Sequence, residues 1–217
     1  MRSLNEYITL NESESGSLRP TSKLELKRLI DQRIKEQGPK CNLNDIDVSG
    51  VRDMSALFEG TDFNGDISKW DVSSVETMHH MFSDSKFNGD ISKWDTSSVE
   101  DMRGMFAHSK FNGDISKWDV SSVENMTGMF QDSQFNGDIS DWDVSKVVSM
   151  SIMFRSSKFN GDISDWDVSR VKDMSEMFMW SQFDGDISGW NVSKVKDMSN
   201  MFSRSPLDRK EPSWYKK

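Results

Sequence analysis

The chain has 217 residues and a formal net charge of −9, and apolar residues make up 35% of it. This length predicts one or two domains. The acidic balance argues against direct nucleic-acid binding, which needs clustered Lys and Arg. A single cysteine, Cys41, excludes an internal disulfide and a multi-cysteine metal site. We see no apolar run of the roughly 18–20 residues that span a bilayer and no secretory signal, so we expect no membrane insertion.

The first part of the chain predicts a short lead-in rather than a domain. Residues 1–20 are rich in Ser, Glu and Asn, so we expect a flexible N-terminal segment. Thr21 and Ser22 then precede apolar residues at helical spacing and a glycine at position 38. This pattern predicts a capping helix over residues 21–38.

A 24-residue repeat occupies most of the remaining chain. The pattern FNGDISKWDVSSVETMHHMFSDSK begins at Phe63 and restarts at Phe87, Phe111, Phe135, Phe159 and Phe183. The repeated slots supply 12 of the 15 Met, 12 of the 13 Phe and 6 of the 8 Trp, so these residues are primarily architectural. We expect a repeat array over residues 39–206, with a degenerate copy at 39–62 and six full copies at 63–206.

The array needs closing at its C-terminal end as well. Trp214 lies 24 residues after Trp190, in the tryptophan slot of a further, partial copy. We therefore expect residues 207–217 to form a C-terminal cap.

Within one copy the apolar spacing changes. Residues 67–72 alternate between apolar and polar side chains, which predicts a strand. Residues 75–82 place their apolar side chains on one helical face, which predicts a short helix. Gly65 and its equivalents are expected in a backbone conformation that side chains disfavour. The predicted fold is α/β: a right-handed leucine-rich-repeat solenoid with a parallel β-sheet on one face and short helices on the other.

The pattern FNGDISxWDVSxVxxMxxMF, together with the lead-in KLELKRLIDQRIKEQGPK, resembles the BspA-like leucine-rich-repeat proteins. That family has many bacterial surface members, and short arrays of this type also occur in phage-encoded proteins. The resemblance covers about residues 22–206. It implies a repeat solenoid that binds other proteins, often in adhesion, and it implies no catalysis.

Two polar positions of the repeat, those of Lys69 and Asp71, form an acidic cluster in the fourth and fifth copies. Lys fills the slot two residues before Asp71 and its equivalents in the first three copies, whereas Asp fills it in copies four and five. The candidate partner-binding carboxylates are Asp141, Asp143, Asp165 and Asp167. On one sheet face they should favour a basic partner. The alternative is a structural role, in which Asp143 and Asp167 hydrogen-bond the backbone of the next turn.

A second candidate is apolar. Met179 and Trp180 occupy a pair of slots that is small or polar in five of the six copies, and Trp is enriched in binding hot spots. Ile152 stands where other copies have His, Gly, Glu or Asn, and it could extend this patch. The alternative is packing of Met179 and Trp180 against the C-terminal cap, through Trp214 or Tyr215.

The sequence predicts neither a metal site nor a cofactor. One Asn and one Asp per copy fall short of the 6–8 oxygen ligands of calcium, so we expect Asn64 and its equivalents to bond neighbouring backbone instead. The three histidines lack a visible third metal ligand. We find no catalytic arrangement of side chains and expect no enzyme activity.

These observations predict a non-catalytic protein-binding module, with capped ends that favour a monomer. The alternative function is an acidic mimic of nucleic acid that inhibits a nucleic-acid-binding or defence protein of a host. We expect a cytoplasmic location, with a virion-associated or surface location as the alternatives.

Overall fold

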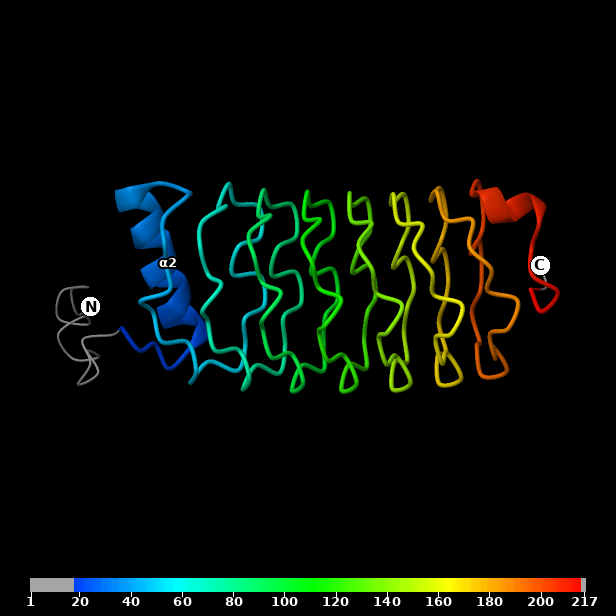
Figure 1. Cartoon of the computed structure of the whole chain (residues 1–217), viewed down its shortest axis with the longest axis horizontal. Helices are drawn as coiled ribbons and strands as arrows, with labels where there is room; N and C mark the ends of the chain where they lie inside the picture. The colour runs from blue at the N-terminus through cyan, green and yellow to red at the C-terminus, as the bar shows by residue number, and fades with distance from the viewer. Residues whose placement is uncertain (1–17, 216–217) are drawn as a thin grey trace.

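The computed structural model describes residues 18–215. The expected flexible segment therefore lies almost entirely outside the described residues. Helix α2 spans Lys23–Gln37, and the 3-10 helix η1 spans Pro206–Arg209. Between them the chain winds into coils of 24 residues that stack side by side along the long axis of the molecule (Figure 1). The leading coil spans residues 39–62, and coils 1 to 6 span 63–86, 87–110, 111–134, 135–158, 159–182 and 183–206.

The prediction of an α/β leucine-rich-repeat solenoid is wrong in its secondary structure. Residues 18–215 contain no β-strand. Successive coils share isolated parallel bridges, such as the one between Thr77 and Asp101. The coils contain no helix either. Helix α2 precedes the leading coil, and η1 begins at the last residue of coil 6. The coils consist of turns, and no parallel sheet or row of short helices forms.

Turns explain why the sequence pattern was misleading. The backbone N–H of Trp70 donates to the Ile67 carbonyl, and that of Val75 to the Val72 carbonyl, so the expected strand is a pair of turns. The N–H of Met81 likewise donates to the Met78 carbonyl. Consecutive turns of this kind return the chain to the core every three residues, which imitates the spacing of a helix face.

Each coil has two residues in the left-handed region of backbone space. They are equivalent to His80 and Asp84, and their φ angles lie between 50° and 65° throughout the stack. A left-handed residue reverses the peptide direction, which allows the alternate N–H groups of Met78, His80, Phe82 and Asp84 to point the same way. These four donate to carbonyls of coil 2 over 2.7–2.9 Å. Other N–H groups close turns within the coil, and a few, such as those of Glu76 and Lys86, donate to carbonyls of the preceding coil.

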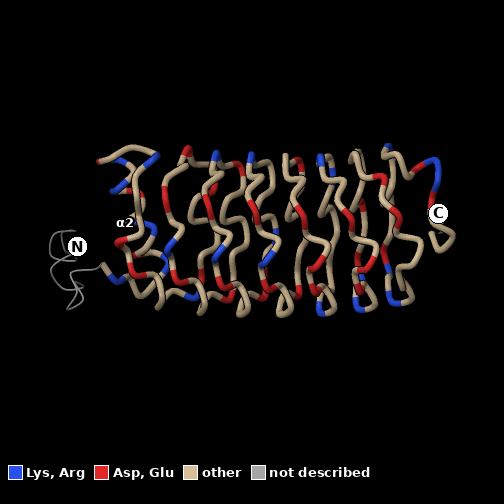
Figure 2. Tube along the Cα trace, viewed as in Figure 1, with Lys and Arg blue, Asp and Glu red and all other residues tan. Residues whose placement is uncertain are grey.

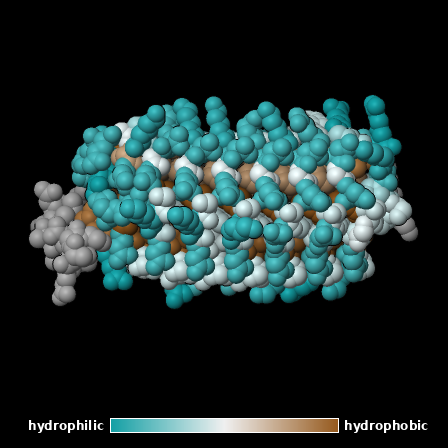
Figure 3. Space-filling model, in the orientation of Figure 1, coloured by the Kyte–Doolittle hydropathy of each residue, from teal (hydrophilic) through white to brown (hydrophobic). Residues whose placement is uncertain are grey.

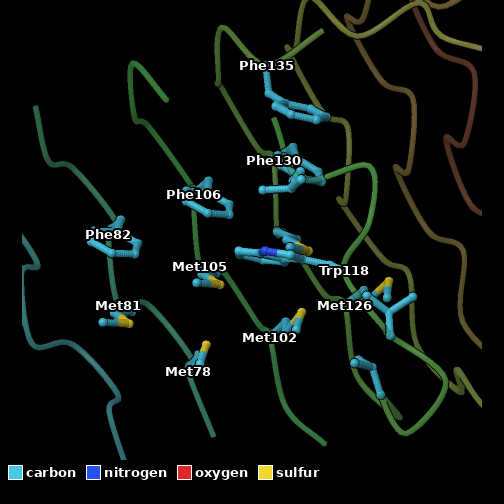
Figure 4. Close-up of a cluster of buried hydrophobic side chains, with 14 of the residues drawn as sticks. Met78, Met81, Phe82, Met102, Met105, Phe106, Trp118, Met126, Phe130 and Phe135 are labelled. Carbon is cyan, nitrogen blue, oxygen red and sulfur yellow. The ribbon is translucent and has the colours of Figure 1, made fainter. Parts of the chain in front are cut away.

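The core consists of the same slots from successive coils. The repeated Phe, Met, Trp, Ile and Val side chains are almost all buried, and Met or Phe side chains from equivalent slots line up in Figure 4. Phe82 stacks on Phe106 with ring centroids 5.7 Å apart, and Phe87 stacks on Phe111 at 6.3 Å. Apolar surface shows only in rows between hydrophilic side chains on the visible face (Figure 3).

The repeat glycines are required for space and not for backbone conformation, which corrects the sequence-based expectation. None of Gly65 and its equivalents has a positive φ. A Cβ at Gly65 would lie 2.0 Å from the Cys41 carbonyl oxygen, and one at Gly113 would lie 2.9 Å from the Phe111 ring. The glycine lets the phenylalanine ring fold back over its own backbone.

Both ends of the stack are covered. Helix α2 begins after Ser22, whose side chain accepts a hydrogen bond from the Glu25 N–H, and ends before Gly38, and it buries Leu26, Leu29 and Ile30. At the other end, the Trp214 ring stacks on Trp190 with centroids 6.4 Å apart. The C-terminal tail therefore adds one more rung to the tryptophan column. Within residues 18–215 we find no helix long and apolar enough to cross a membrane.

Candidate functional site

Several carboxylates on the surface of each coil organise the turn in which they lie. Asp66 accepts hydrogen bonds from the backbone N–H of Ser68 at 3.0 Å and from its hydroxyl at 2.7 Å. Asp71 makes the same pair of bonds with Ser73 at 3.1 and 2.6 Å. The backbone N–H of Ser68, followed by side-chain donors, holds the pKa of Asp66 below its usual value.

The four predicted partner-binding aspartates are all exposed, but the structure divides them into two pairs. Asp141 and Asp165 line a shallow groove of about 180 Å³ together with Asp162, which the sequence reasoning did not single out. Asp143 and Asp167 do not line this groove. No sheet face brings the four carboxylates together.

Asp143 and Asp167 have structural partners within their own coils. They accept backbone hydrogen bonds from Ser145 and Ser169, each at 3.0 Å. The structural alternative was therefore right about a backbone bond, although the bond stays within the coil. The Ser169 hydroxyl and N–H, and to a smaller extent Lys194, lower the pKa of Asp167.

Nearby cations reduce the charge of the acidic surface. Lys117 lies 3.5 Å from Asp141, in the same slot of the preceding coil, and both side chains are largely exposed. Lys146 adds to the lowering of the Asp119 pKa, after the dominant bonds from Ser121. Among residues 18–215 no group of three or more His, Cys, Asp or Glu is placed to hold a metal ion.

The expected asparagine ladder is confirmed. The Asn64 side-chain oxygen accepts a hydrogen bond from the Asn88 N–H at 2.9 Å. The same bond joins each following pair of coils, and Asp184 donates to Asn160 at its end. These side chains therefore tie neighbouring coils together.

Trp180 is the most distinctive side chain on the surface. It is 47% exposed, and Leu24 is the other large apolar side chain that is exposed among the described residues. Its φ of 59° is unfavourable for a bulky residue. The guanidinium carbons of Arg155 and Arg204 lie 5.9 and 5.4 Å from its ring centroid, within cation–π range.

The structure does not place Trp180 against the C-terminal cap. The Trp214 ring packs with Trp190, Phe202 and Tyr215 instead. Met179 is half-buried, and its carbonyl accepts a hydrogen bond from the Ser156 N–H at 2.8 Å. The alternative in which this pair packs on Trp214 or Tyr215 is not supported by any contact of Trp180 with them.

Ile152, the expected extension of this patch, lies in coil 4, one coil before Trp180. It is half-buried with a φ of 51°, an unusual value for a β-branched residue. Its terminal methyl lies 3.4 Å from where a Cβ of Gly128 would stand, so it leans toward the preceding coil.

Sequence reasoning missed the two arginines beside Trp180. Arg204 lies 24 residues after Trp180, so it fills the same slot of the next coil, and repeat alignment could have found it. Arg155 is held by an ion pair with Glu176 at 3.0 Å. The patch of Arg155, Trp180 and Arg204 is called the Trp180 patch below.

Comparison with known protein families adds one finding. Residues 27–134 and 107–214 each match the family described as "Mycoplasma protein of unknown function, DUF285". The chain belongs to the DUF285 family. Membership confirms that this DUF285 chain is a repeat protein, which is the broader part of the resemblance seen in the sequence. No curated protein and no solved structure matches the DUF285 chain.

Proposed function

We propose that the chain is a non-catalytic module that binds a protein partner through the Trp180 patch. The observation that carries this proposal is an exposed tryptophan in a left-handed backbone position. The equivalent slots of the other coils hold Gly60, Asp84, His108, Asp132, Ser156 and Arg204. Gly, Asp and His tolerate this conformation better than Trp does.

The stability of the fold alone does not explain a tryptophan at position 180. A bulky side chain at positive φ costs roughly 1–2 kcal/mol, while about half of the ring remains in water and gains little from burial. The flanking arginines hold the ring in place through cation–π contacts. A fixed, half-exposed Trp with Arg beside it has the composition of an interface hot spot.

The narrower resemblance to BspA-like proteins supports the same function, because their repeat arrays bind other proteins. It also supports a bacterial or phage source and leaves the cytoplasm, the virion and the cell surface as proposed locations. The groove beside Asp141 and Asp165 is a second contact region in this proposal, and it would accept a basic side chain of the partner.

The test is affinity capture from a lysate of the native host with Trp180→Ser beside the unchanged protein. Serine is the residue at the equivalent position of coil 4, so the variant should keep the fold. The matched control is Leu24→Ser, which removes the other large apolar side chain that is exposed within residues 18–215, on α2. We expect proteins that bind the unchanged chain and the control but not Trp180→Ser. Equal capture by all three would contradict the proposal.

A second candidate function is an acidic mimic of nucleic acid. The observation in its favour is a row of exposed aspartates, one per coil: Asp66, Asp90, Asp114, Asp138, Asp162 and Asp186. Repeating the capture at low and at high salt separates the two functions. Binding by a charged mimic weakens steeply as salt rises, whereas binding anchored by Trp180 changes little.

A further inference from the structure

A single file of equivalent residues runs along the stack, with Glu side chains in the first coils and Lys side chains in the last. It contains one residue from each coil, in the order Arg52, Glu76, Glu100, Glu124, Val148, Lys172 and Lys196. Each backbone N–H in the file donates to the carbonyl of the previous member over 2.8–2.9 Å. The side chains are therefore fixed in one row, called the charged edge below.

The slot two residues earlier strengthens the separation. It holds Ser74, Ser98 and Ser122 in coils 1 to 3, and Lys146, Arg170 and Lys194 in coils 4 to 6. The charged edge is therefore acidic over coils 1 to 3 and basic over coils 4 to 6. Lys and Arg lie along the lower rim of the C-terminal coils in Figure 2.

This order of charges is unfavourable within one molecule. Neighbours in the file lie about 5 Å apart, the spacing of parallel hydrogen-bonded chains, so like charges repel. Arg52 pairs with Glu76. Within residues 18–215, however, the side chains of Glu100, Glu124, Lys172 and Lys196 make no ion pair, although all four are exposed. Alternating signs would have stabilised the stack.

The same order is favourable between two antiparallel copies. A two-fold axis placed between coils 3 and 4 sets coil 1 against coil 6, coil 2 against coil 5 and coil 3 against coil 4 of the second copy. Each acidic coil then faces a basic coil. The two-fold axis repeats every such contact, as the interface of a symmetric dimer requires. We propose that two copies of this chain associate antiparallel along the charged edge.

A partner of one sign fits less well. An anionic partner would use Lys172 and Lys196 but would leave Glu100 and Glu124 unpaired, and a cationic partner would do the reverse. The expectation of a monomer rested on the capped ends, and caps do not cover the side of the stack. Lys146 and Lys194 also interact with Asp119 and Asp167, so we expect a weak, salt-sensitive dimer.

The test is sedimentation of the full chain over a range of concentrations, at about 20 mM and about 300 mM salt. We expect a monomer–dimer equilibrium whose dissociation constant rises at least about tenfold at the higher salt. A chain that stays monomeric at both salts and at millimolar concentration overturns the proposal.

Two charge-reversed variants test whether the charged edge forms the interface. Glu100→Lys/Glu124→Lys leaves Glu76 as the one acidic member of the file, and Lys172→Glu/Lys196→Glu leaves Arg52 as its one basic member. Each variant alone should dimerise more weakly than the unchanged chain, and mixing the two should give a 1:1 heterodimer. The control Lys110→Glu/Lys158→Glu makes the same charge change as Lys172→Glu/Lys196→Glu at exposed positions outside the charged edge and should dimerise like the unchanged chain. Failure of the mixed variants to pair, or loss of the dimer in the control, overturns the proposal. Trp180→Ser leaves the charged edge unchanged, so this test is independent of the proposed function.

Discussion

The indole nitrogen of Trp118 donates a hydrogen bond to the carbonyl oxygen of Ile91, in the preceding coil, over 3.0 Å. Both residues are buried. The same bond joins Trp70 to Leu43 and recurs in every coil up to Trp214 and Ile187. Each tryptophan thereby fills the core and gives a buried carbonyl a second donor, beside the backbone N–H that closes the turn.

Removing this donor should destabilise the stack. Trp118→Phe keeps an aromatic ring but leaves the Ile91 carbonyl with only the Trp94 N–H, and the lost bond should cost about 0.5–1.5 kcal/mol. Trp214→Phe removes the same bond where the indole is only half-buried, so its loss should be smaller. Chemical denaturation of both variants measures the difference, and equal losses would contradict the role assigned to the buried carbonyl.

Alanine should be tolerated at one glycine and not at another. At Gly113 a Cβ would press on the Phe111 ring, so Gly113→Ala should lose about 1–3 kcal/mol of unfolding free energy. Gly189 has nothing within 4 Å of a Cβ and no positive φ. Gly189→Ala should therefore be neutral or slightly stabilising. Thermal melts of the two variants provide the comparison, and a similar loss in both would show that space at Gly113 does not matter.

The stability of the stack should fall in acid. Backbone and hydroxyl bonds from the serine two residues later lower the pKa of Asp114, Asp138 and Asp162. A carboxyl whose folded-state pKa is lowered stabilises the fold above its unfolded-state pKa. That contribution is lost as the pH falls through the folded-state pKa. We expect the melting temperature to decline from about pH 4 downward.

Asparagine at these three positions provides the control. It keeps the acceptor oxygen but binds no proton, as Asn191 illustrates by accepting a bond from the Ser193 N–H at 3.2 Å. The triple variant Asp114→Asn/Asp138→Asn/Asp162→Asn should show a shallower decline in acid. An unchanged pH profile would contradict the assignment of this pH dependence to the aspartate turns.

The asparagine ladder should contribute modestly to stability. The Asn112 side-chain oxygen accepts the Asn136 N–H at 2.8 Å in an exposed position. Asn112→Ala should lose about 0.5–1.5 kcal/mol, whereas Asn112→Asp keeps an acceptor and should lose less. Denaturant unfolding distinguishes the two, and equal losses would mean that the bond itself contributes nothing.

The sequence predicted which side chains are buried better than it predicted the backbone. Apolar slots such as Trp70 and Phe82 were placed inside correctly, because burial depends on spacing alone. The strand and helix were wrong because turns repeat with a similar period. The left-handed slots that create these turns hold residues as different as His80, Ile152 and Glu176, so no glycine pattern marked them.

The candidate site was found where one coil departs from the others. Trp180 stands out by comparison of equivalent slots, and the structure leaves it exposed. Arg155 and Arg204 were missed because arginine is unremarkable on a surface until a ring lies beside it. The grouping of Asp141 with Asp162 depends on how the turns fold, which spacing along the sequence does not show.

Near-identity of the coils has a consequence for folding and for evolution. Coil 2 makes the same backbone hydrogen bonds to coil 3 that coil 3 makes to coil 4. A coil that pairs with the wrong coil therefore forms almost the same hydrogen bonds as in the correct pairing. A chain that skips one coil and loops it out loses few bonds. The caps and the few coil-specific side chains must therefore reject such misaligned states. Conversely, gain or loss of a whole 24-residue unit leaves the repeated core contacts intact, so the length of the stack can change in evolution without redesign of its core.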